Sequence, residues 1–289
     1  MKNVAEDTFF KMKKFINCHG NLLDFSTPKV MGILNLTPDS FFDGGIYRNE
    51  KEVHLHVSKM LEEGATIIDI GAQSTRPGSK LLQPEEEWKR LESLLNMIRK
   101  EFPSINISID TFYADVARKS VEAGADMIND ISGGTIDKNM FATIADLKVP
   151  YILMHSQGMP ATMQDNPQYE NVLKDVMSYF SDRIKQLTSL GVHDIIIDPG
   201  FGFGKNLNHN YTLLNHMDHF RIFERPVMAG LSRKSMVSKL LNVKTKDALN
   251  GTTALNTIAL MKGATIVRVH DVKEAVETIK LVDALMNAQ

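Results

Sequence analysis

The chain has almost no cysteine, no strong net charge and no long apolar run, and each of these shortages excludes a class of protein. Cys18 is the single cysteine in 289 residues, so no intramolecular disulfide can form, and its thiol is expected to act as a small apolar filler. Lysine plus arginine number 33 against 35 for aspartate plus glutamate, a formal net charge of -2. Without a positive field, the chain is not expected to bind nucleic acid or acidic lipid.

No stretch of the sequence predicts a membrane-spanning helix, and the first residues do not resemble a secretory signal. They read MKNVAEDTFFKMKKF, with charges where a signal peptide needs an unbroken apolar segment. We therefore expect a cytoplasmic protein whose partners are small molecules or a second copy of the chain. Because no linker or low-complexity stretch interrupts the sequence, we expect residues 1–289 to form a single domain.

Short apolar runs rich in Val and Ile alternate with longer segments of helical periodicity. The predicted strands are VMGILNL, TIIDIG, NISID, ADMIND, VPYILMH, DIIID, PVMAG and TIVRV. They are apolar almost throughout, which is typical of parallel strands covered on both faces. Several of the predicted helices end at a glycine, a common stop signal: Gly64, Gly124, Gly191 and Gly263.

Eight strand and helix units in strict alternation predict an α/β fold of the (β/α)8 TIM-barrel type over about residues 30–289. An open doubly wound sheet is the alternative. The preceding segment KKFINCHGNLLDF predicts a short N-terminal β-hairpin that closes the floor of the barrel.

Polar side chains follow every predicted strand, and in a barrel these ends meet at the rim that holds the active site. In chain order they are Asn35; Gln73 to Arg76; Asp110 and Thr111; Asn129 and Asp130; His155; Asp198; Arg233 and Lys234; Arg268 and His270. Taken singly, each could be a helix cap or a turn former, and Asp39, Asp43 and Asp130 are open to that interpretation. His155 is left unassigned, because a histidine at a strand end is more often a hydrogen-bonded core residue than a catalyst. Together, acids, amides and cations at one rim favour a binding site.

The chemistry of this rim suggests its ligand. Asp110, Asn129 and Asp198 end apolar strands, where a buried acid or amide needs a partner such as adjacent N–H donors. Cations suited to phosphate oxygens and neutral hydrogen-bonding groups complete the rim: Arg76, Lys234, Arg268 and His270, with Asn35 and Thr75. These residues predict a nitrogen-rich heterocycle that bears phosphate.

Seven blocks occur in order, one at each of seven strand ends: NLTPDSF, DIGAQSTRPG, SIDTF, INDISGG, DPGFGFGK, GLSRKS and RVHDV. They resemble the signature blocks of the dihydropteroate synthase family, from Val30 to about Asp271. The resemblance implies a transferase of folate biosynthesis, a homodimer inhibited by sulfonamides. Such an enzyme condenses (7,8-dihydropterin-6-yl)methyl diphosphate with 4-aminobenzoate to give 7,8-dihydropteroate and diphosphate, by ionisation of the pterin substrate and capture by the arylamine.

The resemblance also implies roles for individual residues. The pterin is expected to contact Asp110, Asn129, Asp198 and Lys234. The diphosphate is expected to contact Asn35, Thr75, Arg76, Arg268 and His270, with Asn35 also holding Mg²⁺. The aminobenzoate is expected to contact Thr75, Pro77, Phe203 and Ser235. Catalysis is assigned to Asp110, Lys234, Arg268 and His270, acting through their charges rather than as nucleophiles.

Two departures and three alternatives accompany this interpretation. Gln73 stands where the family more often has Glu, and HSQGMP differs from the family after the fifth strand. A methyltetrahydrofolate to corrinoid methyltransferase would lack the STRPG, SRKS and RVH groups, and a non-catalytic barrel would bind pterin without turnover. A dinucleotide-dependent oxidoreductase would depend on the glycines of DPGFGFGK, whose spacing fits neither nucleotide motif. Phe203 and Lys205 in that block are instead expected to border the second substrate.

Overall fold

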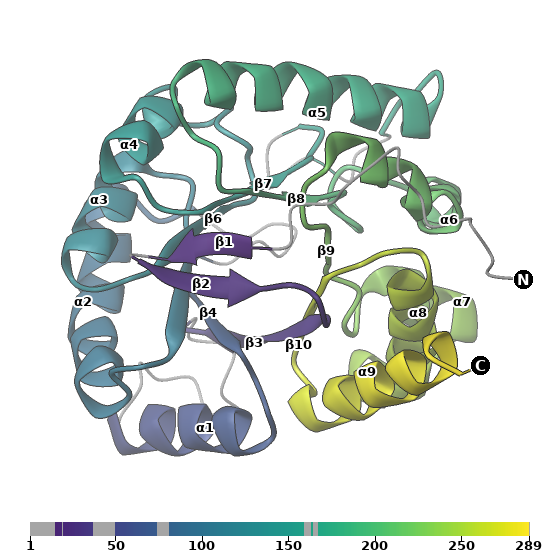
Figure 1. The fold of residues 1–289 in the computed structure, drawn as a ribbon, viewed down its shortest axis with the longest axis horizontal. Coiled ribbons are helices and arrows are strands. Elements are labelled where there is room, and N and C mark those ends of the chain that lie inside the picture. Colours follow the sequence, from purple (N-terminus) through teal and green to yellow (C-terminus); the bar gives the residue numbers. More distant parts are fainter. Residues whose placement is uncertain are drawn as a thin grey trace, which may run out of the picture.

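The computed structural model describes residues 15–18, 20–36, 50–73, 81–158, 163 and 167–288. Eight parallel strands curl around a central axis with helices outside them (Figure 1). The strands are β3 (Lys29–Asn35), β4 (Ile67–Gly71), β5 (Asn106–Asp110), β6 (Met127–Asp130), β7 (Tyr151–Met154), β8 (Ile195–Asp198), β9 (Met228–Ala229) and β10 (Ile266–Val269). All eight strands predicted from the sequence are confirmed.

The order of the strands distinguishes a barrel from an open sheet. The first barrel strand, β3, pairs with both β4 and the last strand, β10. Strands β8 and β9 meet through a parallel bridge between Ile197 and Val227, and the Ile197 amide donates to the Pro226 carbonyl at 3.0 Å. The predicted (β/α)8 barrel is therefore confirmed, and the doubly wound sheet is wrong.

The helices run along the outside of the barrel. They are α1 (Glu50–Glu62), α2 (Pro84–Glu101), α3 (Ala114–Glu122), α4 (Met140–Leu147), α5 (Val172–Ser189), α6 (Leu207–Asn215), α7 (Ser235–Leu241), α8 (Leu249–Met261) and α9 (Val272–Met286), with 3-10 turns η1 (Met217–Phe223) and η2 (Thr245–Asp247). The four predicted glycine stops all have positive φ, between 85° and 103°. Within the described ranges, none of these helices is both long and apolar enough to cross a membrane.

The unbroken apolar character of the strands follows from their burial on two faces. Every residue of β4, β6, β7 and β8 is buried. Side chains on one face pack against the surrounding helices, and those on the other fill the barrel interior, so neither face selects polar residues.

The N-terminal hairpin closes one end of the barrel. Strands β1 (Phe15–Cys18) and β2 (Asn21–Asp24) pair antiparallel and lie across the barrel in Figure 1. Their inward side chains pack against residues at or near the start of seven barrel strands: Ile16, Cys18, Leu23 and Phe25 against Met31, Ile67, Met127, Ile152, Ile196, Met228 and Ile266. Burial raises the pKa of the Cys18 thiol to about 12, so the expected role as an apolar filler is confirmed.

Removing a buried side chain from this hairpin should destabilise the barrel. Ile16 is fully buried, so Ile16→Ala is expected to lower the free energy of unfolding by about 2–4 kcal/mol. Leu22 of the same hairpin is 67% exposed, and Leu22→Ala should change it by less than about 0.5 kcal/mol. Urea unfolding followed by circular dichroism measures both. Equal losses would contradict the role of the hairpin as the barrel floor.

Candidate active site

Three of the predicted site residues lie side by side because their strands end in register. Asn35 pairs with Gly71, Gly71 with Asp110, and Asp110 with Asn129 along neighbouring strands. A Cβ at Gly71 would lie 3.2 Å from the Asp110 Cβ, so glycine leaves room for this acid. The strand ends thus place an amide, an acid and a second amide in one row at the rim.

Arg268 reaches from β10 to two acids on β4 and β5. Its Nε donates to Asp69 Oδ2 at 2.6 Å, and one terminal nitrogen donates to Asp110 Oδ2 at 2.8 Å. Burial raises the pKa of Asp110 to about 7, and the Arg268 charge acts in the opposite direction. Arg268, predicted to bind diphosphate, is therefore also the ion-pair partner of an acid predicted to bind pterin.

Asp69 is a site residue that the sequence interpretation missed. It is fully buried, and its Oδ2 also accepts a hydrogen bond from the Asn129 amide at 3.1 Å. The signal was present in the sequence, because a charge in the middle of the apolar strand IIDIG is costly to bury without a partner. Asp69 lies inside its strand, whereas the pattern of polar residues that indicates the rim is confined to the strand ends.

Asp198 and Lys234 form a second charged group at the rim. Asp198 is buried, and its Oδ1 accepts a hydrogen bond from the Gly200 amide at 2.8 Å. A Cβ at Gly230 would lie 3.4 Å from Lys234 Nζ and 3.9 Å from Asp198 Oδ2, so the acid and the lysine flank this glycine. Burial raises the pKa of Asp198, and Lys234 opposes that shift. The same burial lowers the pKa of Lys234 to about 8, opposed by Asp198.

Lys234 also contacts the loop that follows β8. Its Nζ donates to the Phe201 carbonyl at 2.5 Å and lies 4.7 Å from the centroid of the Phe203 ring. This cation–π contact orients the exposed part of Phe203 beside the ammonium group. Phe203 packs against an apolar cluster that includes Phe112 and Met154, and the ring is thus an aromatic wall next to Lys234.

The glycine-rich loop turns its carbonyls toward cations, which is the reverse of a phosphate cradle. Lys205 Nζ is buried and donates to the carbonyls of Gly200, Phe203 and His155 at 3.0, 3.0 and 3.2 Å. It also lies 2.9 Å from His155 Nδ1. The expectation that Lys205 borders the second substrate is wrong, because four protein acceptors surround its ammonium group. His155, which the sequence left unassigned, is buried and hydrogen-bonded to Lys205.

His270 is held by Ser232, which lies in the turn that follows the neighbouring strand β9. The Ser232 Oγ accepts a hydrogen bond from the His270 amide at 3.1 Å and lies 3.0 Å from Nδ1. This contact fixes the orientation of the ring and occupies Nδ1, so Nε2 is the ring nitrogen left for other partners. Desolvation, aided by the charge of Arg268, lowers the pKa of His270 to about 4, so the ring is a neutral donor at pH 7.

Arg233 and Ser235 flank Lys234 but differ from it in placement. The Arg233 guanidinium forms two hydrogen bonds of 2.8 Å to the Asp271 carboxylate, so it braces the loop rather than facing a ligand. Ser235 is exposed at the first position of α7. Thr75, Arg76 and Pro77 lie outside the described residues, as do Asp39 and Asp43.

Gln73, one of the two departures from the family's usual sequence, forms hydrogen bonds with Leu82, so it links the described residues on either side of positions 74–80. Its Nε2 donates to the Leu82 carbonyl and its Oε1 accepts from the Leu82 amide, both at 3.1 Å. The same Nε2 donates to Glu87 at 2.6 Å, and burial raises the pKa of Glu87 to about 7. An ionised Glu at position 73 could not donate either bond, so glutamine suits this environment.

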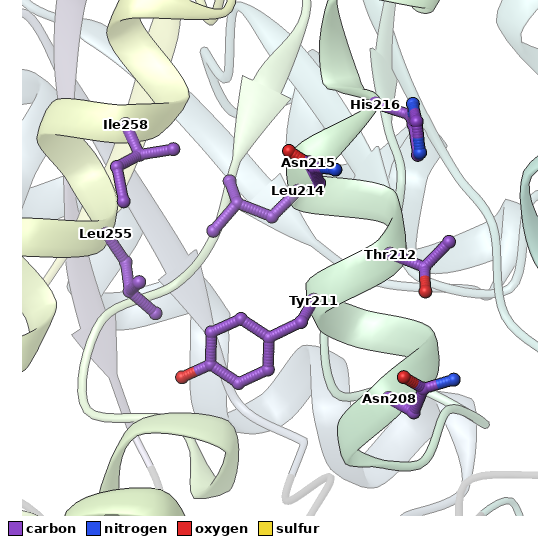
Figure 2. A pocket seen from close by; sticks show the side chains of 8 residues that line it. All are labelled: Asn208, Tyr211, Thr212, Leu214, Asn215, His216, Leu255 and Ile258. Carbon is purple, nitrogen blue, oxygen red and sulfur yellow. The ribbon is translucent and has the colours of Figure 1, made fainter.

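A hollow of about 450 Å³ lies away from these residues, between α6 and α8 (Figure 2). Asn208, Tyr211, Thr212, Leu214, Asn215, His216, Leu255 and Ile258 line it. It has no lysine, arginine or acid in its lining and lies on the outer helices, so the strand-end rim remains the candidate active site. Across the described residues, no group of three His, Cys, Asp or Glu is placed to hold a metal ion.

Comparisons with known proteins show which family the chain resembles. Residues 31–270 match the family described as "Pterin binding enzyme". The dihydropteroate synthase of Escherichia coli K12 is 44% identical over 280 residues, covering 96% of this chain and 98% of that protein. The dihydropteroate synthase of Haemophilus influenzae is 43% identical over 279 residues, covering 96% and 100%.

Two solved structures have the same fold. The Yersinia pestis dihydropteroate synthase in a sulfonamide complex has a TM-score of 0.89 at 42% identity, covering 95% of this chain and 100% of that one. The Xanthomonas albilineans dihydropteroate synthase with 4-aminobenzoic acid has a TM-score of 0.88 at 35% identity, covering 96% and 99%. With these identities over nearly the whole chain, the protein belongs to the dihydropteroate synthase family of pterin-binding enzymes.

Proposed function

We propose that this rim catalyses the reaction of the family to which the chain belongs. Under this proposal, (7,8-dihydropterin-6-yl)methyl diphosphate and 4-aminobenzoate give 7,8-dihydropteroate and diphosphate, with sulfonamides competing for the aminobenzoate site. The observation that carries the proposal is the meeting of Asp110, Asn129 and Asp198 with Lys234 and Arg268 at one end of the barrel. Acids and amides suit the nitrogen-rich ring, and the cations suit its diphosphate.

The pterin ring is proposed to contact the buried acceptors. Asp198 Oδ1 is held by the Gly200 amide, which leaves Oδ2 near Lys234 to accept ring N–H groups. Asn129 Oδ1 is buried and has no hydrogen-bond partner among the described residues. A buried acceptor without a partner is uncommon in a native protein, and a ligand N–H would satisfy it.

The leaving diphosphate is proposed to contact the cationic side of the rim. Arg268 supplies a permanent charge, and the neutral His270 supplies its Nε2–H. Thr75 and Arg76 are proposed to join them. Asp110 competes with the diphosphate for Arg268, so charge developing on the leaving group would draw the guanidinium toward it.

The bond changes need no nucleophile from the protein. The methylene C–O bond breaks with its electron pair leaving on the diphosphate, and the pterin cation is captured by the arylamine nitrogen, which then loses a proton. Asp110 and Asp198 stabilise the electron-poor ring, while Lys234, Arg268 and His270 stabilise the departing oxyanion. Phe203, Ser235 and Pro77 are proposed to border the aminobenzoate, with Phe203 as an apolar wall that excludes water.

Mg²⁺ is proposed to bind with the diphosphate rather than in a preformed cage. Mg²⁺ accepts one or two protein oxygens, keeps several waters and uses substrate phosphates as its remaining ligands. The side-chain oxygen of Asn35, at the end of β3, fits that donor type, and the described residues supply no group of three His, Cys, Asp or Glu. When bound there, the ion would neutralise charge on the leaving group.

A homodimer working in the cytoplasm completes the proposal. Apolar side chains remain exposed along the late helices of the barrel: Leu240, Leu241, Ile258, Met261, Leu281, Leu285 and Met286. Because α8 contacts both α7 and α9, these side chains lie on neighbouring helices. Several exposed apolar side chains on neighbouring helices are typical of a surface that another protein covers, and a second copy is the proposed occupant.

The activity itself is tested by product formation. With the pterin diphosphate, 4-aminobenzoate and Mg²⁺, the chain should release diphosphate and form dihydropteroate, identified by mass. Asp198→Asn should lower kcat/KM by about 30- to 100-fold because a buried charged acceptor is lost. Asp126→Asn, which alters the ion pair with Arg99 near the start of β6, is the control and should keep the wild-type rate. No dihydropteroate at any Mg²⁺ concentration would contradict the proposal.

Arg268→Ala should separate the anion site from the pterin site. We expect affinity for the pterin diphosphate to fall at least about tenfold more than affinity for 6-hydroxymethylpterin, because only the former carries the phosphates. Isothermal titration calorimetry in the absence of aminobenzoate measures both. Arg99→Ala removes the ion pair with Asp126 and should leave the ratio unchanged. Equal losses on the two ligands would refute the anion assignment.

The ionisation of Lys234 predicts an alkaline limit to binding. Burial lowers its pKa to about 8, and diphosphate binding favours the charged ammonium form. Affinity should therefore be full below about pH 8 and fall about tenfold per pH unit above it. In Lys234→Arg, which stays protonated, calorimetry should show no such decline up to about pH 9.5. A decline that persists in this variant would assign the limit to another group.

A further inference from the structure

We propose that Asp69 is a positioning residue: through Oδ2 it orients the Asn129 amide toward the pterin and anchors the Arg268 guanidinium beside the diphosphate. This role rests on the proposed function of the rim. It concerns a residue in the middle of β4, one layer below the strand ends that carry the other site residues.

One oxygen of Asp69 serves two partners. Asp69 Oδ2 accepts from Arg268 Nε at 2.6 Å and from Asn129 Nδ2 at 3.1 Å, and the Asp69 side chain is fully buried. Each contact joins strands that are far apart in sequence, β4 with β10 and β4 with β6. A single carboxylate therefore sets the position of two groups that the site uses.

The contact with Asn129 determines which end of the amide faces the ligand. An ionised carboxylate can only accept hydrogen bonds, so Asn129 must turn its nitrogen toward Asp69 and its oxygen away. That oxygen is buried and has no partner within the described part of the chain. Were Asn129 only a structural link, its oxygen would be expected to have a partner too. Asp69 therefore makes Asn129 an acceptor, matched to a ring N–H.

The two ion pairs of Arg268 have different roles: the pair with Asp69 anchors the guanidinium, and the pair with Asp110 is released when substrate binds. Arg268 uses Nε for Asp69 and a terminal nitrogen for Asp110. When the pterin takes Asp110, the terminal nitrogens become available to phosphate oxygens while Asp69 still holds Nε. The guanidinium then stays at the rim at the moment its ion pair with Asp110 is exchanged. One arginine can in this way pair with an acid first and with the leaving group later.

A charge-swap pair of variants tests the orientation. Asp69→Asn places at position 69 an amide that can donate as well as accept, so the Asn129 nitrogen no longer has to face it. Affinity for 6-hydroxymethylpterin should then fall about tenfold or more. Asn129→Asp alone sets two carboxylates about 3.1 Å apart, given the present contact, and should also bind weakly. The double variant D69N/N129D should recover at least about half of the loss on a logarithmic scale. In that variant the amide introduced on β4 can donate to the carboxylate introduced on β6. Both ends of a carboxylate are oxygens, so this group presents an acceptor to the ligand in either orientation.

Asp126→Asn is the matched control, since Asp126 pairs with Arg99 and accepts from the Ile107 amide near the opposite ends of β5 and β6. It should lower thermal stability without changing pterin affinity. Binding is measured by calorimetry on variants whose folding is checked by circular dichroism. Should Asp69→Asn fail to fold, the double variant carries the test, and a folded double variant that does not bind would overturn the role.

Two further outcomes are decisive. Wild-type affinity in a folded Asp69→Asn, or a double variant no better than either single one, would contradict the positioning role while leaving the proposed function intact. A wild-type chain that binds no pterin would contradict the proposed function and this role together. Recovery of affinity in the double variant, with all three variants folded, would support the role, because only the double variant restores both the amide-to-carboxylate contact and an oxygen that faces the ligand.

Discussion

The site depends on one constraint: Asp69 has no access to water, so its charge must be met from within the protein. The partner comes from the last strand, and Arg268 lies 199 positions along the chain from the acid that it neutralises. Only a closed barrel, in which β10 lies beside β3 and close to β4, brings these two residues within 2.6 Å. Pairing of this buried charge therefore depends on closure of the barrel. Loss of the ion pair or of the closure would leave an unpaired charge inside the protein.

The lysines at the rim are held by a different kind of partner. Lys205 and Lys234 are neutralised only in part by acids, and most of the hydrogen bonds of their ammonium groups go to backbone carbonyls of the loop after β8. Lys205 also lies 2.9 Å from His155 Nδ1. Carbonyls can turn inward there because Gly200, Gly202 and Gly204 adopt positive φ, and a Cβ at Gly200 would lie 1.9 Å from the His155 carbonyl. The glycines thus create fixed dipoles around the cations, and the site is organised before any substrate arrives.

Much of this was accessible from the sequence, because periodicity and strand-end chemistry are local signals. The eight strands, the glycine stops and the hairpin were predicted, and so was the rim position of Asp110, Asn129, Asp198 and Lys234. What could not be predicted is the direction in which a long side chain turns. Lys205 belongs to the same loop as Phe203, yet its ammonium group turns inward to His155. Arg268 lies at the rim but pairs with acids of the protein. Such choices are made by partners far away in the sequence.

The balance of charge at the rim explains why the proposed diphosphate site needs more than Arg268. Among the described residues, the acids Asp69, Asp110 and Asp198 face the cations Lys205, Lys234 and Arg268, so the two signs nearly cancel. His270 adds no charge at neutral pH because desolvation lowers its pKa. A diphosphate brings about two or three negative charges to a region with little excess of positive charge. Each negative charge that stays unpaired as the diphosphate departs raises the activation barrier for breaking the C–O bond. Arg76 and Mg²⁺ are therefore proposed to supply the missing positive charge, the ion binding together with the diphosphate.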